Sequence, residues 1–194
     1  MEIKNTKPDV RLLYDMKKVI YDKKWLKTAK NLELYYMYRG VKNKKDLRYD
    51  ITIIPGQMLG KEFSKTKGHS HNKKFGEIYT VLSGEAIYLM QKVKKDKVID
   101  VYAVKTKKGE SVIVPACYGH ITINPSKKTL KEANWVSKDC KNIYEGFEKF
   151  NGACYYYTKE GWIKNKKYVN IPPLRFERPL KKFPKNLNFL YGNN

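Results

Sequence analysis

Histidine and cysteine are scarce in this chain, and long apolar runs are absent. Only three histidines and three cysteines occur among 194 residues. No stretch approaches the roughly 20 apolar residues of a transmembrane helix, and the N-terminus has no apolar signal core. We therefore expect a cytoplasmic protein with no membrane association. The cysteines fit reduced thiols better than a disulfide framework, and Cys117 is expected to be a small buried side chain rather than one facing a cavity.

Acidic residues are also few. The chain has 19 aspartates and glutamates but 41 lysines and arginines, which gives a formal net charge of +22. Such a surface attracts phosphate backbones non-specifically. However, the lysines are spread from end to end, and no helix-turn-helix, zinc-finger or RNA-binding signature is present. We expect no specific nucleic-acid partner, whereas small anionic substrates would be attracted.

Short strand-like segments separated by Gly or Pro dominate the middle of the chain. They cover residues 50–55, 77–82, 85–91, 98–104, 111–114 and 121–123. This pattern predicts an antiparallel barrel or sandwich. The best helix candidate is 22–30 with Asp22 as its N-cap, and four prolines between 172 and 184 predict an extended tail. We expect one domain over 1–194, with a barrel core of about 48–170 and a C-terminal arm of about 171–194.

All three histidines fall in two short motifs. His69 and His71 lie in Gly-His-Ser-His, Glu77 follows six residues later, and His120 comes from a distant segment. Residues two apart on a strand share a face, so His69 and His71 can both point inward, as can Glu77 and Tyr79. Three imidazoles and a carboxylate suit a divalent transition metal, and octahedral coordination would leave two positions open. The pattern favours a catalytic metal site over a chance His-x-His.

These residues, with Gly84, Gly109, Pro115 and Asn124, have the spacing of the cupin motifs. More specifically, the chain resembles the cupin-type phosphoglucose isomerases of archaea. The resemblance is carried by Pro-Gly-x3-Gly-Lys-Glu-Phe-x2-Thr-Lys-Gly-His-x-His at 55–71, then Glu77-x-Tyr79. Arg-Leu-x-x-Asp-Met at 11–16 and Gly-Trp-Ile-Lys at 161–164 extend it over about 11–170.

The resemblance implies an all-β cupin, a double-stranded β-helix or jelly-roll barrel, with a short N-terminal helical element and an extended tail. It implies one divalent metal ion per subunit, with Fe²⁺ expected and Mn²⁺, Ni²⁺, Co²⁺ or Zn²⁺ as alternatives, and a homodimer. The implied metal ligands are His69, His71, Glu77 and His120. The implied contacts to the sugar phosphate are Thr52, Thr66, Gly68 and Tyr79. Between 133 and 144 the chain has no histidine where better-known members have one, and Tyr144 is the match for a catalytic tyrosine.

The activity implied is the interconversion of glucose 6-phosphate and fructose 6-phosphate, a step of glycolysis and gluconeogenesis. The metal would act as a Lewis acid on the substrate oxygens. Glu77 is the candidate base of an enediol route, whereas a hydride shift between C1 and C2 needs no such base. Two alternatives stay open: a cupin isomerase or epimerase of another sugar phosphate, and a non-catalytic cupin that binds a sugar.

Overall fold

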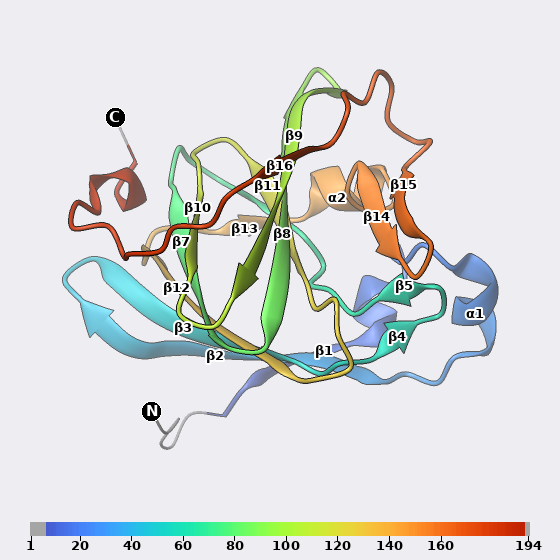
Figure 1. Cartoon of the computed structure of the whole chain (residues 1–194), viewed down its shortest axis with the longest axis horizontal. Helices are drawn as coiled ribbons and strands as arrows, with labels where there is room; N and C mark the ends of the chain where they lie inside the picture. Colours follow the sequence, from blue (N-terminus) through green and yellow to red (C-terminus); the bar gives the residue numbers. More distant parts are fainter. Residues whose placement is uncertain (1–6, 193–194) are drawn as a thin grey trace.

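Two antiparallel sheets face each other across the interior of the molecule in the computed structural model, which describes residues 7–192 (Figure 1). The six-stranded sheet has the order β1 (Asp9–Leu12), β2 (Glu33–Lys44), β3 (Leu47–Ile54), β12 (Leu130–Ser137), β7 (Glu77–Ser83) and β10 (Ser111–Val114). The four-stranded sheet has the order β11 (Gly119–Ile123), β8 (Glu85–Lys94), β9 (Lys97–Lys107) and β16 (Arg175–Glu177), the last pairing in parallel.

Shorter elements surround the two sheets. The strands are β4 (Met58–Leu59), β5 (Glu62–Phe63), β6 (Ser70–His71), β13 (Asn142–Ile143), β14 (Tyr155–Thr158) and β15 (Gly161–Lys164). The helical turns are η1 (Leu13–Met16), α1 (Lys23–Thr28), α2 (Glu145–Lys149) and η2 (Asn188–Leu190). Within residues 7–192 no helix exceeds the six residues of α1, so none is long enough to cross a membrane.

The strand order is that of a jelly roll. Along the chain, β3 joins the first sheet, and residues 65–69 then bridge to β11 in the second, through Lys65 with Ile123 and His69 with His120. The chain returns for β7, crosses for β8 and β9, and alternates again through β10, β11 and β12. Two interlocked Greek keys of eight segments define this architecture. The predicted all-β cupin barrel is therefore confirmed.

Most of the predicted elements lie where the sequence places them. The segments expected at 77–82, 85–91, 98–104 and 111–114 correspond to β7, β8, β9 and β10. The predicted helix is α1, and the Asp22 carboxylate accepts a hydrogen bond of 3.0 Å from the amide of Trp25, as an N-cap does. Strands β2 and β12 were not predicted. In addition, Cys117 is exposed with a φ of 68°, so its expected burial is wrong.

The register across β3, β12 and β7 arranges inward-facing side chains in layers. Thr52 lies opposite Glu132, which lies opposite Val81 on its other side. One step along the strands, Asp50, Asn134 and Tyr79 form the next layer. In the opposite direction, the fully buried pair Ile54 and Leu130 closes the interior with apolar surface. The polar layers in the middle of the barrel are thus bordered at one end by the apolar layer of Ile54 and Leu130.

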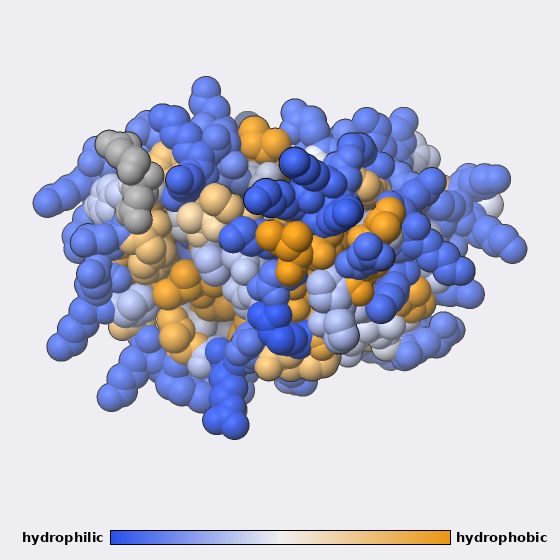
Figure 2. Space-filling model, turned by 90° about the horizontal axis from the view of Figure 1, so that it is seen from above, coloured by the Kyte–Doolittle hydropathy of each residue, from blue (hydrophilic) through white to orange (hydrophobic). Residues whose placement is uncertain are grey.

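Hydrophilic side chains project around much of the outline of the face in Figure 2, and hydrophobic groups lie between them, many near its centre. This view agrees with the even spread of lysine along the sequence. The three cysteines are all free, as expected for reduced thiols. The tail is mostly extended, and its β16 segment runs along the outer edge of β9 (Figure 1).

A buried ion pair fixes the N-terminal segment to the barrel. Glu62 and Lys65 form a salt bridge, with both side chains at most 3% exposed. The second carboxylate oxygen of Glu62 accepts the amide of Tyr21 at 3.0 Å, and the Lys65 ammonium donates to the carbonyl of Val19 at 2.9 Å. Each charge therefore also holds the backbone of the segment that packs against it.

Lys65→Met should lower the free energy of unfolding by about 3–5 kcal/mol, because it leaves the Glu62 carboxylate buried without its partner. Urea denaturation of the variant measures the loss. The double variant Glu62→Gln, Lys65→Met removes both charges and should recover much of it. As a matched control, Lys105→Met breaks the exposed pair with Glu85 and should cost less than about 1 kcal/mol. Equal losses for Lys65→Met and Lys105→Met would contradict this role of the buried pair.

Candidate metal centre and adjoining pocket

Four side chains converge inside the barrel and form a compact set of possible metal ligands: His69, His71, Glu77 and His120. The Oε2 atom of Glu77 lies 3.2 Å from Nε2 of His71, 3.2 Å from Nε2 of His120 and 3.9 Å from Nε2 of His69. The backbones of His69 and His120 exchange two hydrogen bonds, of 3.1 and 2.9 Å. The sequence predicted this convergence from strand parity.

The donor atoms fit a single divalent ion. One ligand atom from each residue lies within 4.8 Å of all the others. Ligand bonds of about 2.0–2.2 Å place donors roughly 3 Å apart when adjacent and roughly 4.3 Å apart when opposite. Moreover, Nε2 of His71 and Oε2 of Glu77 are buried without a hydrogen-bond partner. Buried polar atoms are costly when unpaired, so these atoms suit a metal ion.

Neighbouring groups orient the ligands. Nδ1 of His71 lies 2.9 Å from the carbonyl of Phe75, so a proton on Nδ1 leaves the Nε2 lone pair directed at the cluster. Asn134 donates its amide to Oε1 of Glu77 at 2.5 Å, so the other oxygen, Oε2, is the one that faces the imidazoles. The hydroxyl of Tyr79 lies 3.2 Å from Nε2 of His120.

Three of the four ligands are held in the protonation state that a metal ion needs, whereas His71 carries a proton that the ion must displace. Burial, followed by the neighbouring His120, holds the pKa of His69 well below its ordinary value, and burial lowers the pKa of His120. Burial opposes ionisation of Glu77, but the His120 and His71 imidazoles, each 3.2 Å from its Oε2, hold the pKa of this carboxyl well below the ordinary value. For His71, burial is outweighed by Cys140 and Glu77, and its pKa rises to about 11. A metal ion bound at His71 would therefore release a proton.

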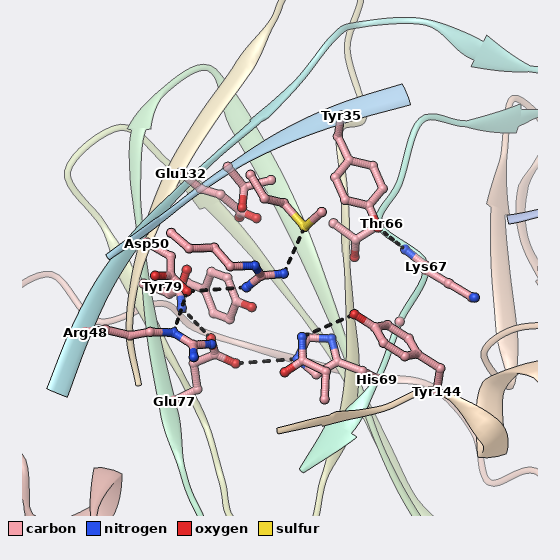
Figure 3. A pocket seen from close by; sticks show the side chains of 16 residues that line it. Tyr35, Arg48, Asp50, Thr66, Lys67, His69, Glu77, Tyr79, Glu132 and Tyr144 are labelled. Carbon is pink, nitrogen blue, oxygen red and sulfur yellow. Dashed lines mark hydrogen bonds and ion pairs between the residues drawn. The ribbon is translucent and has the colours of Figure 1, made fainter. Parts of the chain in front are cut away.

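A pocket adjoins the cluster and contains the residues predicted to act on the substrate (Figure 3). Besides His69 and Glu77, its lining includes the five other predicted residues Thr52, Thr66, Gly68, Tyr79 and Tyr144. His71 and His120 complete the cluster but do not line the pocket, and their side chains are only 2% exposed. The fold thus brings every predicted site residue into one place. Their individual roles remain predictions.

The loop that carries Thr66 and Gly68 leaves donors free toward this pocket. The Thr66 hydroxyl accepts the amide of Thr122 at 3.0 Å, so its own O–H is available to donate. Gly68 has a φ of 83°, and an added Cβ would lie 2.5 Å from Ile121 and 2.6 Å from the ring of Phe147. Only glycine fits this closely packed left-handed position, which brings its backbone to the pocket wall.

Sequence reasoning missed the positive charges of the pocket, which are Arg39, Arg48 and Lys67. The contacts implied for the sugar phosphate, Thr52, Thr66, Gly68 and Tyr79, include no charged side chain. Asp50 pairs with Arg48 at 2.9 Å and with Arg39 at 3.5 Å, so one carboxylate is shared by two guanidinium groups. The strand parity of 48, 50 and 52 could have revealed Arg48, because residues two apart share a face.

Tyr144 lies on the wall of the pocket immediately before α2. Its ring is 6.0 Å from the ring of His69, between centroids, and its hydroxyl accepts a hydrogen bond of 3.4 Å from Asn142. The Lys67 ammonium lies 5.0 Å from its ring centroid, and the Arg11 guanidinium 5.7 Å. These cation–π contacts hold the ring in place. Tyr144 therefore lies near the cluster. Among residues 7–192, no hydrogen bond joins it to Glu77.

Comparison with known proteins identifies relatives. The family model of glucose-6-phosphate isomerase matches residues 10–173. The glucose-6-phosphate isomerase of Thermococcus litoralis is 32% identical over 132 residues, covering 65% of this chain and 67% of that protein. The enzyme of Pyrococcus abyssi is 34% identical over 128 residues, covering 63% and 66%. The matched segment thus spans about two thirds of these relatives.

Solved structures whose backbone is similar in part include an oxalate oxidase. It has a TM-score of 0.48 and 15% sequence identity, and the match covers 60% of this chain and 57% of that one. A predicted oxalate decarboxylase from Thermotoga maritima has a TM-score of 0.44 and 16% identity, with coverage of 69% and 94%.

His120→Ala and His69→Ala should each weaken metal binding by more than about 100-fold, because loss of an outer partner alone costs 10–100-fold. Metal analysis after dialysis, and titration against a chromogenic chelator, measure the effect. Thermal unfolding in excess chelator serves as the control, since metal-free variants and metal-free wild type should melt alike if the folds match. Full metal occupancy in both variants would place the ion elsewhere.

Proposed function

Because the chain belongs to the glucose-6-phosphate isomerase family, we propose that it is a metal-dependent aldose–ketose isomerase that interconverts glucose 6-phosphate and fructose 6-phosphate. The observation that carries this proposal is the placement of the His69, His71, Glu77 and His120 cluster against a pocket with cationic walls. A divalent ion would supply Lewis-acid chemistry to the hydroxyl and carbonyl oxygens of the sugar. Fe²⁺ is the ion we expect, since imidazole and carboxylate ligands suit it.

The pocket supports an anionic substrate. Arg39, Arg48 and Lys67 carry three positive charges on its walls, while Asp50 balances part of them. Thr52, Thr66 and the backbone of Gly68 offer hydrogen-bond donors nearby. We assign them to the phosphate group, because hydroxyl and amide donors bind phosphate oxygens well, and nearby cations strengthen that binding.

Glu77 is the chain's candidate for proton transfer between C1 and C2. Asn134 fixes one carboxylate oxygen, and the low pKa keeps the group ionised at neutral pH, which is the state a base needs. The same low pKa makes it a weak base, however, so the hydride shift remains the competing route. Tyr144, on the adjoining wall, is assigned a supporting role in orienting the sugar.

The decisive test is an isomerase assay on metal-reconstituted protein with glucose 6-phosphate, fructose 6-phosphate and other sugar phosphates. Glu77→Gln, assayed with excess metal, should retain a loss of about 10²–10⁴-fold in kcat if Glu77 is the base. Solvent deuterium incorporated at C1 or C2 in the wild type, and lost in the variant, would support the enediol route. Turnover without incorporation favours the hydride shift, and absence of turnover with any sugar phosphate contradicts the proposal.

Thr66→Val should raise the KM for glucose 6-phosphate by about tenfold or more with little change in kcat. A hydrogen bond to a charged group contributes about 1.5–3 kcal/mol, and this contact persists throughout the reaction. Thr66→Ser keeps the hydroxyl and is the matched control. Initial rates over a range of substrate concentration measure both constants. Unphosphorylated fructose should be a far poorer substrate than its 6-phosphate, and equal efficiency on the two would exclude a phosphate site.

A further inference from the structure

Glu132 is a buried acidic side chain for which the proposed reaction has no role. It is 1% exposed, yet it lines the same pocket as Thr52 and Tyr79. Figure 3 shows its carboxyl group directed into this pocket rather than away from it. No ion pair to lysine, arginine or histidine is formed by Glu132 within residues 7–192. A buried carboxyl with no cationic partner is costly when ionised.

The surroundings of Glu132 contain hydrogen-bonding groups but no cation paired with it. In its own layer it is flanked by Thr52 of β3 and Val81 of β7, and Met37 of β2 lies beyond Thr52. From the opposite sheet, the Tyr88 hydroxyl of β8 donates to Oε2 of Glu132 at 2.6 Å. Thr122 of β11 also lowers the pKa of the carboxyl group. The Glu77 carboxylate acts on it repulsively. The Arg39 guanidinium lines the same pocket and donates to Sδ of Met37 at 3.3 Å, but it forms no ion pair with Glu132.

Glu132 lies at the opposite end of the pocket layers from the metal ligands. Asn134, two residues further along β12, occupies the layer of Asp50 and Tyr79 and holds Glu77. Two residues of a strand span about 6.6–6.8 Å, so Glu132 lies roughly that distance from the residue that orients Glu77. Its direct neighbour is instead Thr52, which we have assigned to the phosphate. The position therefore belongs to substrate binding and not to the metal.

An ionised Glu132 at this position would repel a phosphate dianion. Burial, together with repulsion from the Glu77 carboxylate, raises the pKa of Glu132 to about 8, although the hydrogen bond from Tyr88 and the neighbouring Thr122 favour ionisation. Burial also raises the pKa of Tyr88 well above its ordinary value, so Tyr88 remains a donor. Near pH 7 the carboxyl group is therefore mostly uncharged, with one proton that it can donate.

We infer that Glu132 binds the substrate as an uncharged acid, donating its proton to an oxygen at the phosphate end of the sugar phosphate while Tyr88 holds its other oxygen. This inference rests on the proposed function, because it takes a sugar phosphate as the ligand. It makes the affinity depend on pH. Glu132 must carry its proton to bind, so affinity is full below its pKa and falls as the pH rises through it.

The test measures binding of glucitol 6-phosphate, which has no carbonyl group and cannot be isomerised, to the metal-loaded protein by calorimetry from pH 7 to pH 9.5. A phosphate ester is a dianion throughout this range, since its second pKa is about 6. For the wild type the Kd should be about 30-fold weaker at pH 9.5 than at pH 7, from one proton with a pKa of about 8. A Kd that does not change with pH would overturn the inference.

Three variants sharpen the result. Glu132→Gln keeps a donor with no charge, so its Kd should stay within about twofold of the wild-type value at pH 7 and remain constant to pH 9.5. Tyr88→Phe removes a bond that favours ionisation, so the loss of affinity should move to higher pH. Glu85→Gln, on the exposed side of β8, is the matched control and should behave as wild type. A Glu132→Gln variant with the pH dependence of the wild type would overturn the inference.

Turnover and binding together distinguish a wrong role for Glu132 from a wrong proposed function. Wild-type protein that neither isomerises glucose 6-phosphate nor binds glucitol 6-phosphate would overturn both. Wild-type turnover accompanied by pH-independent binding would overturn only the role of Glu132. Thermal unfolding and metal content are compared for all variants, and Tyr88→Phe decides the question if Glu132→Gln does not fold. An unchanged pH profile in Tyr88→Phe would count against the inference.

Discussion

The burial of the Glu77 carboxylate is the constraint on which the rest of the site depends. The residue is 3% exposed, and an isolated charge at this depth would be strongly unfavourable. Asn134 binds one of its oxygens, and the histidines surround the other. Glu77 itself belongs to β7, and these partners come from β11, β12 and the segment around β6. The jelly-roll topology is what brings segments so distant in sequence around one carboxylate.

The two buried carboxyl groups of the pocket, Glu77 and Glu132, avoid the free-energy cost of a buried, unpaired charge in opposite ways. Glu77 stays ionised because imidazoles and an amide stabilise its charge. Glu132 has hydroxyl donors but no cationic partner, and burial favours its protonated form. Both point inward from neighbouring strands of one sheet. Their different surroundings follow from the register of β12 against β3 and β7, because Asn134, which binds Glu77, lies between Asp50 and Tyr79, whereas Glu132 lies between Thr52 and Val81.

The sequence was sufficient for the metal cluster but not for the pocket around it. His69 and His71 obey a local parity rule, and scarcity of histidine made the set conspicuous. By contrast, β12 carries Glu132 and Asn134 on its inner face, so its pattern of polar residues resembles a solvent-exposed segment. Arg39 reaches the pocket beside a register shift between Tyr38 and Lys42, which no periodicity reveals. Partners of buried polar groups are set by long-range pairing, and a single sequence does not contain that register.

The pairing of β16 with β9 has a consequence for how the chain is made. Strand β9 is 11 residues long, and without the arm its outer backbone groups would form an open edge available to another chain. Residues 175–177 emerge from the ribosome after the barrel strands, so this edge stays uncovered until these residues have been made. A nascent chain stalled shortly before this segment would expose the unpaired backbone of β9, which could pair with a strand of another chain. The abundant lysines of the chain would then limit such self-association through charge repulsion.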